Sequence, residues 1–336
     1  MENLIKIANR MVGKGKGILA ADESTPTCTK RFDALGIKST YENRNEYRDM
    51  LITTQNIENY IGGVIMFDET LRQSTTCEKK TSFVDYLNSL GIVPGIKVDK
   101  GVKNLAGFKG EKITEGLDGL RERLEEYFEI GARFAKWRAV ITIDDGIPSV
   151  GCIHANAHAL ARYAALCQES GLVPIVEPEV LMDGSHSIER CYDVTDQTLS
   201  VTFEHLDNQN VFLGGIVLKP NMVISGLNCD NQASIEKVAE MTLKCLKKNV
   251  PQEVPGIAFL SGGQSSDLAT YHLNTMNSMD SNLPWNLTFS YGRALQQDAL
   301  NAWSGFNREN GQNEFILRAK NNSLATSGKL DYNIVK

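Results

Sequence analysis

Short apolar runs recur along the whole chain, and each is separated from the next by a longer stretch that mixes apolar and polar residues. Eight such runs lie at about residues 17–22, 61–67, 92–98, 133–140, 173–180, 212–219, 256–261 and 285–291. Runs of this length that are bounded by glycine or proline are typical of buried strands in a parallel sheet.

The stretches between these runs have the spacing of helices. Residues 156–170 place Ala157, Leu160 and Ala164 on one side, and a second helix is expected over residues 235–246. Strands that alternate with helices form parallel sheets, and eight repeats over 336 residues favour a closed (β/α)8 TIM barrel over a doubly wound sheet.

The pattern of alternating strands and helices also predicts the domain organisation. No linker rich in proline, glycine and serine divides the chain, so we expect residues 1–336 to form a single barrel domain. The segment after about residue 304 is polar, and we expect residues 328–336 to be a short, loosely held C-terminal tail.

Composition and charge narrow the class of protein. The formal net charge of −6 and the pI near 5.5 argue against a nucleic-acid-binding protein. No apolar stretch is long enough to span a membrane, and the N-terminus does not resemble a secretion signal. The seven cysteines form no CxxC pair, which predicts reduced thiols and a cytoplasmic location.

Several of the apolar runs end in charged residues. They are Asp22, Lys97, Asp99, Lys136, Arg138, Glu177, Glu179 and Lys219. A charged group at the end of a buried strand is costly to remove from water, so it needs a partner or a function. In a barrel, these strand ends meet at the face that carries the active site.

The chemistry of this set centres on Lys219 and Lys136. A lysine beside another cation in a partly dry pocket has a lowered pKa, and its amine then attacks carbonyls to give a Schiff base. Glu177 is placed to move protons during imine formation, and Asp22 is a second candidate base. The competing interpretation is a purely structural network of ion pairs.

A phosphate site is predicted where the last two strands end. The seventh run leads into Ser261-Gly262-Gly263-Gln264, and the eighth leads into Ser290, Gly292 and Arg293 at the start of a helix. Glycine lets the backbone approach an anion, free N–H groups at a helix start bind it, and arginine adds a charged donor.

The segments that carry these residues resemble class I fructose-1,6-bisphosphate aldolases. The resemblance is spread in order over nearly the whole chain, through residues 17–25, 95–101, 136–138, 173–179, 217–221, 260–264 and 290–296. It implies a (β/α)8 barrel that cleaves fructose 1,6-bisphosphate into dihydroxyacetone phosphate and glyceraldehyde 3-phosphate through a lysine imine. It also implies a role in glycolysis or gluconeogenesis, with no metal and no other cofactor.

The resemblance further implies a role for each site residue. Lys219 matches the Schiff-base lysine, Glu177 the acid/base group, and Lys136 a catalytic lysine. Glu179 belongs to the surrounding charge network, Asp22 handles the substrate hydroxyl, and Arg138 binds a substrate phosphate. The ketone-end phosphate would be held by Ser261, Gly262, Gly263, Ser290, Gly292 and Arg293, with Arg31 nearby, and the other phosphate by Ser24, Thr27 and Lys97.

Two departures from the family pattern stand out. Pro26-Thr27 replaces the usual glycine-serine, which keeps a hydroxyl but stiffens the loop. Family members usually carry a longer tail with a terminal tyrosine that assists proton transfer on the enamine. Here Tyr332 is followed by residues 333–336, and Lys336 is last, so we expect enamine protonation to be slow or to use another donor.

Other interpretations of the sequence remain open. The chain could be another lysine-imine barrel, such as a transaldolase or a deoxyribose-phosphate aldolase, or a non-catalytic scaffold for protein partners. His154 and His158 are spaced as a metal pair on a helix, but the sequence shows no obvious third ligand, so no metal site is predicted.

The family resemblance implies a homotetramer that acts on small sugar phosphates, and no segment identifies a protein partner.

Overall fold

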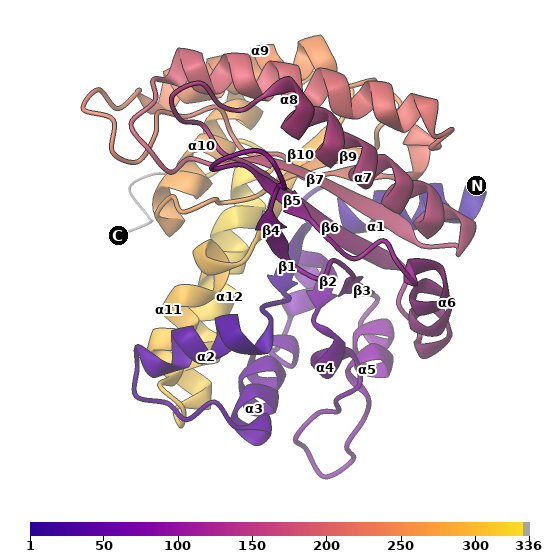
Figure 1. Cartoon of the computed structure of the whole chain (residues 1–336). Coiled ribbons are helices and arrows are strands. Elements are labelled where there is room, and N and C mark those ends of the chain that lie inside the picture. Colours follow the sequence, from indigo (N-terminus) through magenta and orange to yellow (C-terminus); the bar gives the residue numbers. More distant parts are fainter. Residues whose placement is uncertain (332–336) are drawn as a thin grey trace.

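The computed structural model describes residues 1–331, and in them eight parallel strands close into a barrel that is surrounded by helices (Figure 1). The strand order around the barrel is β1-β10-β9-β8-β7-β6-β3-β2, so the first strand pairs with both the second and the last. The (β/α)8 barrel predicted from the sequence is confirmed.

The barrel strands are β1 Gly17–Ala21, β2 Ile61–Met66, β3 Val93–Lys97, β6 Phe134–Ile141, β7 Val173–Val180, β8 Val217–Leu218, β9 Gly256–Phe259 and β10 Asn286–Tyr291. The helices are α1 Glu2–Met11, α2 Thr25–Asp33, α3 Tyr41–Ile52, α4 Asp68–Leu71, α5 Phe83–Ser89, α6 Leu120–Ile130, α7 Val150–Glu169, α8 Ile188–Asn208, α9 Ile235–Asn249, α10 Ser266–Met279, α11 Arg293–Trp303 and α12 Arg308–Ala325. The 3₁₀ turns η1 and η2 span Ile57–Asn59 and Leu213–Gly215.

The sixth predicted strand is wrong over most of its length. Residues 213–215 form the turn η2, and β8 contains only Val217 and Leu218. This turn packs closely against α1, because a Cβ on Gly215 would lie 2.9 Å from Cβ of Leu4. The other strands begin and end within two residues of the predicted positions. The predicted helix over residues 235–246 lies within α9, and the one over residues 156–170 lies within α7 except for its last residue, the C-cap Ser170.

Helix α1 closes the N-terminal end of the barrel. Its buried side chains Leu4, Ala8 and Met11 join one apolar cluster with residues from the inner faces of the strands, namely Ile18, Ala20, Ile65, Val93, Phe134, Val173, Ile175, Val217 and Ala258. At Gly62, a Cβ would lie 2.6 Å from the carbonyl oxygens of Arg10 and Met11. This glycine therefore lets the end of α1 rest directly on β2.

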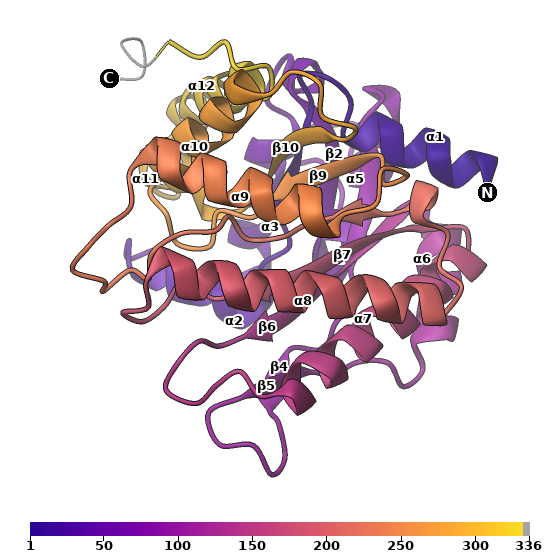
Figure 2. The same cartoon turned by 90° about the horizontal axis from the view of Figure 1, so that it is seen from above.

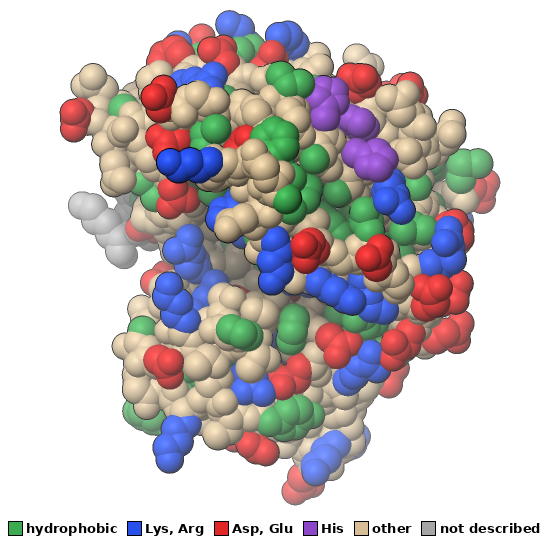
Figure 3. Space-filling model, viewed as in Figure 1, with side chains coloured by type: hydrophobic (Ala, Val, Ile, Leu, Met, Phe, Trp, Pro, Cys, Tyr) green, Lys and Arg blue, Asp and Glu red, His purple; other side chains and the backbone are tan. Residues whose placement is uncertain are grey.

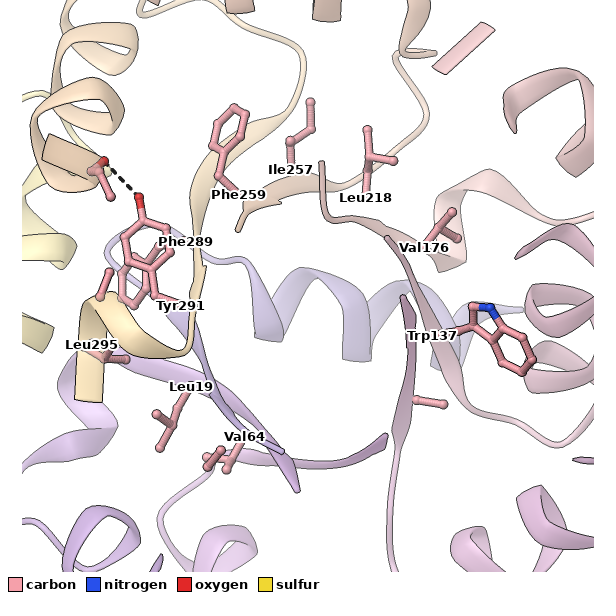
Figure 4. Close-up of a cluster of buried hydrophobic side chains, with 14 of the residues drawn as sticks. Leu19, Val64, Trp137, Val176, Leu218, Ile257, Phe259, Phe289, Tyr291 and Leu295 are labelled. Carbon is pink, nitrogen blue, oxygen red and sulfur yellow. Dashed lines mark hydrogen bonds between the residues drawn. The ribbon is translucent and has the colours of Figure 1, made fainter. Parts of the chain in front are cut away.

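A second apolar layer lies between the strands and the surrounding helices (Figure 4). Leu19, Val64, Val176 and Leu218 point outward from their strands into this layer. Two of the labelled side chains carry a polar atom: the Tyr291 hydroxyl donates to the Ala269 carbonyl oxygen at 2.9 Å, whereas the buried indole N–H of Trp137 has no hydrogen-bond partner among the described residues. Both of these layers are apolar. The charged side chains inside the barrel therefore lie at the end opposite α1.

A short antiparallel hairpin, which the sequence did not predict, stands beside the barrel. Its strands are β4 Val102–Asn104 and β5 Lys112–Thr114. They contain three residues each and are largely exposed or half-exposed, so they produce no apolar run. The Thr114 hydroxyl donates to the Arg138 carbonyl oxygen at 2.6 Å, which fixes the hairpin next to β6.

The first part of the expected tail is held in place. Leu330 is buried, and its backbone N–H donates to Oδ1 of Asn274 at 2.9 Å. Residues 332–336 of the expected tail lie outside the described part of the chain. Among residues 1–331, no helix has both the length and the apolar character needed to cross a membrane.

Candidate active site

The inner faces of the barrel strands change from apolar to charged toward their C-terminal ends. Alternate residues on a strand point to the same side, so charged residues two positions after an inner apolar residue also point inward. The pattern is Ile18 and Ala20 before Asp22, Phe134 before Lys136 and Arg138, Ile175 before Glu177 and Glu179, and Val217 before Lys219. These charged groups therefore lie together at the C-terminal end of the barrel.

Glu177 is at the centre of this group and contacts both lysines. Its Oε1 lies 3.1 Å from Nζ of Lys219, and its Oε2 lies 3.1 Å from Nζ of Lys136. Lys136 also donates to Oδ2 of Asp22 at 3.1 Å. All four residues are at least 90% buried, so the chain Lys219–Glu177–Lys136–Asp22 is a dry, charge-balanced network.

The two lysines differ in environment, which corrects one expectation. We expected a lowered pKa for lysine in this pocket, but for Lys136 this is wrong. Burial alone would lower its pKa, yet the carboxylates of Asp22 and Glu177 outweigh burial and hold the pKa above its usual range. Lys136 is therefore a fixed cation.

Asp22 is correspondingly held as a carboxylate. Burial acts to raise its pKa, but the cations of Lys136, Lys219 and Lys97 together lower the pKa well below its usual range. Arg138 is half-exposed, and its pKa is raised because the carboxylate of Glu179, to which it donates, outweighs the effect of partial burial. Glu179 thus orients Arg138 toward the cleft.

The glycine loop after β9 needs glycine for two reasons. Gly262 and Gly263 have φ values of +60° and +114°, which favour glycine over other residues. In addition, a Cβ on Gly262 would lie 2.1 Å from Cε of Met182. The backbone N–H groups of this loop can therefore approach a bound anion closely.

A second anion-binding element faces this loop. Helix α11 begins after Gly292 with no side-chain cap at its N-terminus, so its first N–H groups are available to an anion. Arg293, the first residue of α11, extends one guanidinium nitrogen to within 3.4 Å of a Cβ position on Gly263. Ser290 precedes it on the inner face of β10.

The opposite side of the site carries the other predicted phosphate contacts. The hydroxyls of Ser24 and Thr27 lie 3.1 Å apart, and Nζ of Lys97 lies 2.5 Å from Oδ1 of Asp99. Pro26 falls within the first turn of α2, where its missing N–H costs no helical hydrogen bond. Pro26-Thr27, which stands where the family usually has glycine-serine, is therefore compatible with a regular start of α2.

All of these residues line a single cleft of about 540 Å³. The sixteen residues predicted from the sequence line it without exception: Asp22, Ser24, Thr27, Arg31, Lys97, Lys136, Arg138, Glu177, Glu179, Lys219, Ser261, Gly262, Gly263, Ser290, Gly292 and Arg293. Figure 3 shows the hollow with lysine and arginine side chains around it. The cleft thus presents cations at its rim and a network of both signs at its base.

The structure adds ion pairs and charged groups of the site that could not be assigned from the sequence. Glu23 pairs with Arg31 and also with Arg48, whose guanidinium lies 2.7 Å from Oε2 of Glu23. Asp99 holds Lys97, and Asp183 lines the cleft. Arg48 lies within the helical pattern of α3, so only its buried position reveals it. The expectations about Tyr332 and Lys336 concern residues outside the described part of the chain.

Comparison with known proteins gives a consistent result. The family model for class I fructose-bisphosphate aldolases matches residues 3–336. The chain is 58% identical to a probable class 1 fructose-bisphosphate aldolase from Xanthomonas campestris, over 98% of both chains. It is 50% identical to fructose-bisphosphate aldolase C-B from Danio rerio, over 98% of this chain and 91% of that one.

A solved structure agrees in three dimensions. The fructose-bisphosphate aldolase from Plasmodium falciparum, crystallised with TRAP and a small-molecule inhibitor, superimposes with a TM-score of 0.96 at 48% identity, over 98% of this chain and 95% of that one. The fold is that of a lyase built on a (β/α)8 barrel. The chain belongs to the class I fructose-bisphosphate aldolase family, whose members cleave fructose 1,6-bisphosphate through a Schiff base.

Proposed function

We propose that Lys219 is the residue that forms the Schiff base. Its amine attacks the C2 carbonyl of open-chain fructose 1,6-bisphosphate, and the resulting carbinolamine loses water to give an iminium ion. The C4 hydroxyl then loses its proton, the C3–C4 bond breaks, and its electrons pass to the iminium to form an enamine. Glyceraldehyde 3-phosphate leaves, the enamine takes a proton at C3, and hydrolysis releases dihydroxyacetone phosphate.

Glu177 carries the main support for this assignment. One of its oxygens lies 3.1 Å from the proposed nucleophile and the other 3.1 Å from a fixed cation. A carboxylate in this position can take the proton that Lys219 must lose before attack, and can return it to the carbinolamine oxygen as water leaves. Lys136 stabilises the carboxylate form of Glu177 between these two steps.

Asp22 is the group that we assign to the C4 hydroxyl. Its carboxylate is kept ionised by Lys136, Lys219 and Lys97, so it can accept a hydrogen bond from that hydroxyl and draw its proton off during cleavage. Arg138, oriented by Glu179, would bind a substrate phosphate. The elements around Arg293 and around Lys97 would bind the phosphates at the two ends of the sugar chain.

The two anion-binding elements favour a bisphosphate substrate. The elements around Arg293 and Lys97 lie in one cleft, which suits a ligand with a phosphate at each end. A transaldolase or deoxyribose-phosphate aldolase substrate would occupy only one of them. A scaffold without catalysis would gain nothing from the buried Lys219 and Glu177, because burying such charges is costly.

We also propose that the protein is a cytoplasmic homotetramer that works in both glycolysis and gluconeogenesis. The relatives include a cytosolic aldolase from Arabidopsis thaliana, 51% identical over 94% of this chain, and a chloroplastic one from Chlamydomonas reinhardtii. Size-exclusion chromatography with light scattering tests the tetramer, since a mass near four times 37.1 kDa is expected and a monomer would contradict it.

Borohydride trapping tests the proposed chemistry directly. The enzyme is incubated with dihydroxyacetone phosphate and borohydride, with and without EDTA, and digested for peptide mass spectrometry. We expect a stable adduct on Lys219 that EDTA does not affect. An adduct on Lys136 alone would contradict the residue assignment, and activity that EDTA abolishes, with no adduct, would contradict the mechanism.

A further inference from the structure

Three histidines that are far apart in the sequence meet on the outer surface of the barrel. His154 and His158 lie one turn apart on α7, and His205 lies on α8, which runs beside α7 (Figure 2). The space-filling view shows histidine side chains gathered in one patch over these helices, away from the central hollow (Figure 3). His158 is exposed and the other two are half-exposed.

The contacts between these rings are specific. Nδ1 of His154 lies 3.1 Å from Nε2 of His205. The His205 ring packs edge-on against both others, with ring centroids 5.3 Å from His154 and 5.8 Å from His158.

The 3.1 Å separation is close to what a shared metal ion requires. Two nitrogens bound to one tetrahedral zinc ion at about 2.0–2.1 Å lie about 3.3–3.4 Å apart. His154 and His158 at i and i+4 on one helix face have the spacing of a helical metal pair. His205 is the third ligand that the sequence did not reveal, because it comes from the neighbouring helix.

We propose that His154, His158 and His205 form a binding site for a divalent transition-metal ion of the zinc, nickel or copper type, which links α7 to α8. Imidazole suits these metals, and three imidazoles with a water molecule complete a tetrahedral shell. The exposed side of the cluster leaves room for that water.

The site needs a limited rearrangement before it can hold the ion. Within residues 1–331, no three side chains of His, Cys, Asp or Glu are placed to hold a metal as they stand. His154 and His205 already face each other through ring nitrogens, and the exposed His158 ring has to turn toward them. The ring that now donates the hydrogen bond must also take its other tautomer, with the proton on its solvent-facing nitrogen.

Metal titration of the full chain tests this proposal. The protein is freed of metal with EDTA, and Co²⁺ binding is followed by visible absorption, then Zn²⁺ binding by calorimetry. We expect one ion per chain and a cobalt spectrum of tetrahedral or five-coordinate type without thiolate charge transfer. Zn²⁺ should also raise the melting temperature, because a ligand that binds only the folded state stabilises it.

Single variants separate this site from other metal ligands in the chain. H154A, H158A and H205A should each weaken binding by roughly ten-fold or more, since even loss of an outer-shell partner costs about 10–100-fold. H186A is the matched control, because His186 lines a different surface cavity, and it should bind as the unaltered chain does. Alkylation of the cysteines should also leave the affinity unchanged.

The opposite results would overturn the proposal. If H205A binds as tightly as the unaltered chain, or if alkylation abolishes binding, the ligands are elsewhere. If no ion binds at millimolar metal, the three rings are only a packed, hydrogen-bonded cluster. Aldolase activity should be the same in H158A as in the unaltered chain, because the cluster lies outside the cleft, so this test is independent of the catalytic assignment.

Discussion

At the scale of single residues, the site depends on one carboxylate that contacts two lysines. Glu177 can exchange a proton with Lys219 because Lys136 compensates its charge on the other side. Replacing Glu177 or Lys136 therefore changes more than one contact. The two residues can be tested separately, because replacing Glu177 should lower kcat and replacing Lys136 should lower the stability of the fold.

Glu177→Gln should reduce kcat by about 10²–10⁴-fold, the usual contribution of a positioned acid/base group. The amide has the same shape but cannot accept the Lys219 proton. Steady-state assays and the rate of borohydride trapping should fall together, since both depend on imine formation. A variant that traps substrate at the normal rate would show that Glu177 acts only after the imine has formed.

Lys136→Met should destabilise the fold by about 3–5 kcal/mol at pH 7, because it leaves two buried carboxylates with one cation between them. The pKa of Asp22 is depressed in the folded state, so its ionised form stabilises the protein above pH 4 and this contribution is lost as the pH falls further. The deficit of the variant should therefore shrink in acid, as urea unfolding at pH 7 and pH 3 would show.

The double variant Lys136→Met, Asp22→Asn is the control for that experiment. It restores the balance of charge in the network, and most of the lost stability should return at pH 7. If the double variant is as unstable as the single one, the loss comes from packing around the lysine stem and not from unpaired charge.

At the scale of elements, the glycine loop after β9 is supported from behind by α10. Nδ1 of His272 lies 2.6 Å from Oε1 of Gln264, and the Gln264 side-chain amide donates to the Ser261 carbonyl oxygen at 3.3 Å. Burial lowers the pKa of His272 to about 4, so the ring is neutral near pH 7 and donates from Nδ1. His272 thus positions the loop without touching the substrate.

His272→Leu should raise KM for fructose 1,6-bisphosphate by about 2–10-fold with little change in kcat, since one hydrogen bond of about 0.5–1.5 kcal/mol is lost. His272→Asn keeps a donor near the Nδ1 position and should restore KM. Inhibition by inorganic phosphate gives a second measurement and should weaken in parallel with KM. An equal fall in kcat for both variants would point to a general disturbance of the fold.

The closing helix α1 supports the fold at the end away from the chemistry. Met11→Ala should destabilise by about 2–5 kcal/mol, because Met11 is fully buried and the variant leaves a cavity. Met11→Leu conserves volume and should cost less than about 1.5 kcal/mol. Urea unfolding measures both, and kcat of the folded Ala variant should stay normal. A large loss of kcat would mean that α1 also shapes the cleft.

At the scale of the whole molecule, the sequence predicts those features that a single segment determines. Lys219, Glu177 and Lys136 could be found because each interrupts or ends an apolar run. The approach of Leu4 to Gly215 joins segments that are far apart in the sequence and leaves no local signal. The same holds for Arg48 against Glu23 and for His205 against His154. Contacts between distant segments need the structure.

The charge distribution of the whole molecule also predicts a kinetic effect. The chain carries a net charge of −6, yet lysine and arginine side chains surround the cleft (Figure 3). Such a cationic rim should draw in a bisphosphate from solution, and salt should screen this attraction. We expect kcat/KM for fructose 1,6-bisphosphate to fall between low and physiological sodium chloride while kcat stays constant.

Fructose 1-phosphate provides the matched comparison because it carries one phosphate fewer. Its kcat/KM should fall less steeply with salt, since the attraction scales with the charge of the substrate. Equal slopes for the two substrates would mean that the rim does not steer binding and that salt acts on the catalytic network itself. In that case kcat would also fall with salt, because the ion pairs of Glu177 and Asp22 would be the groups affected.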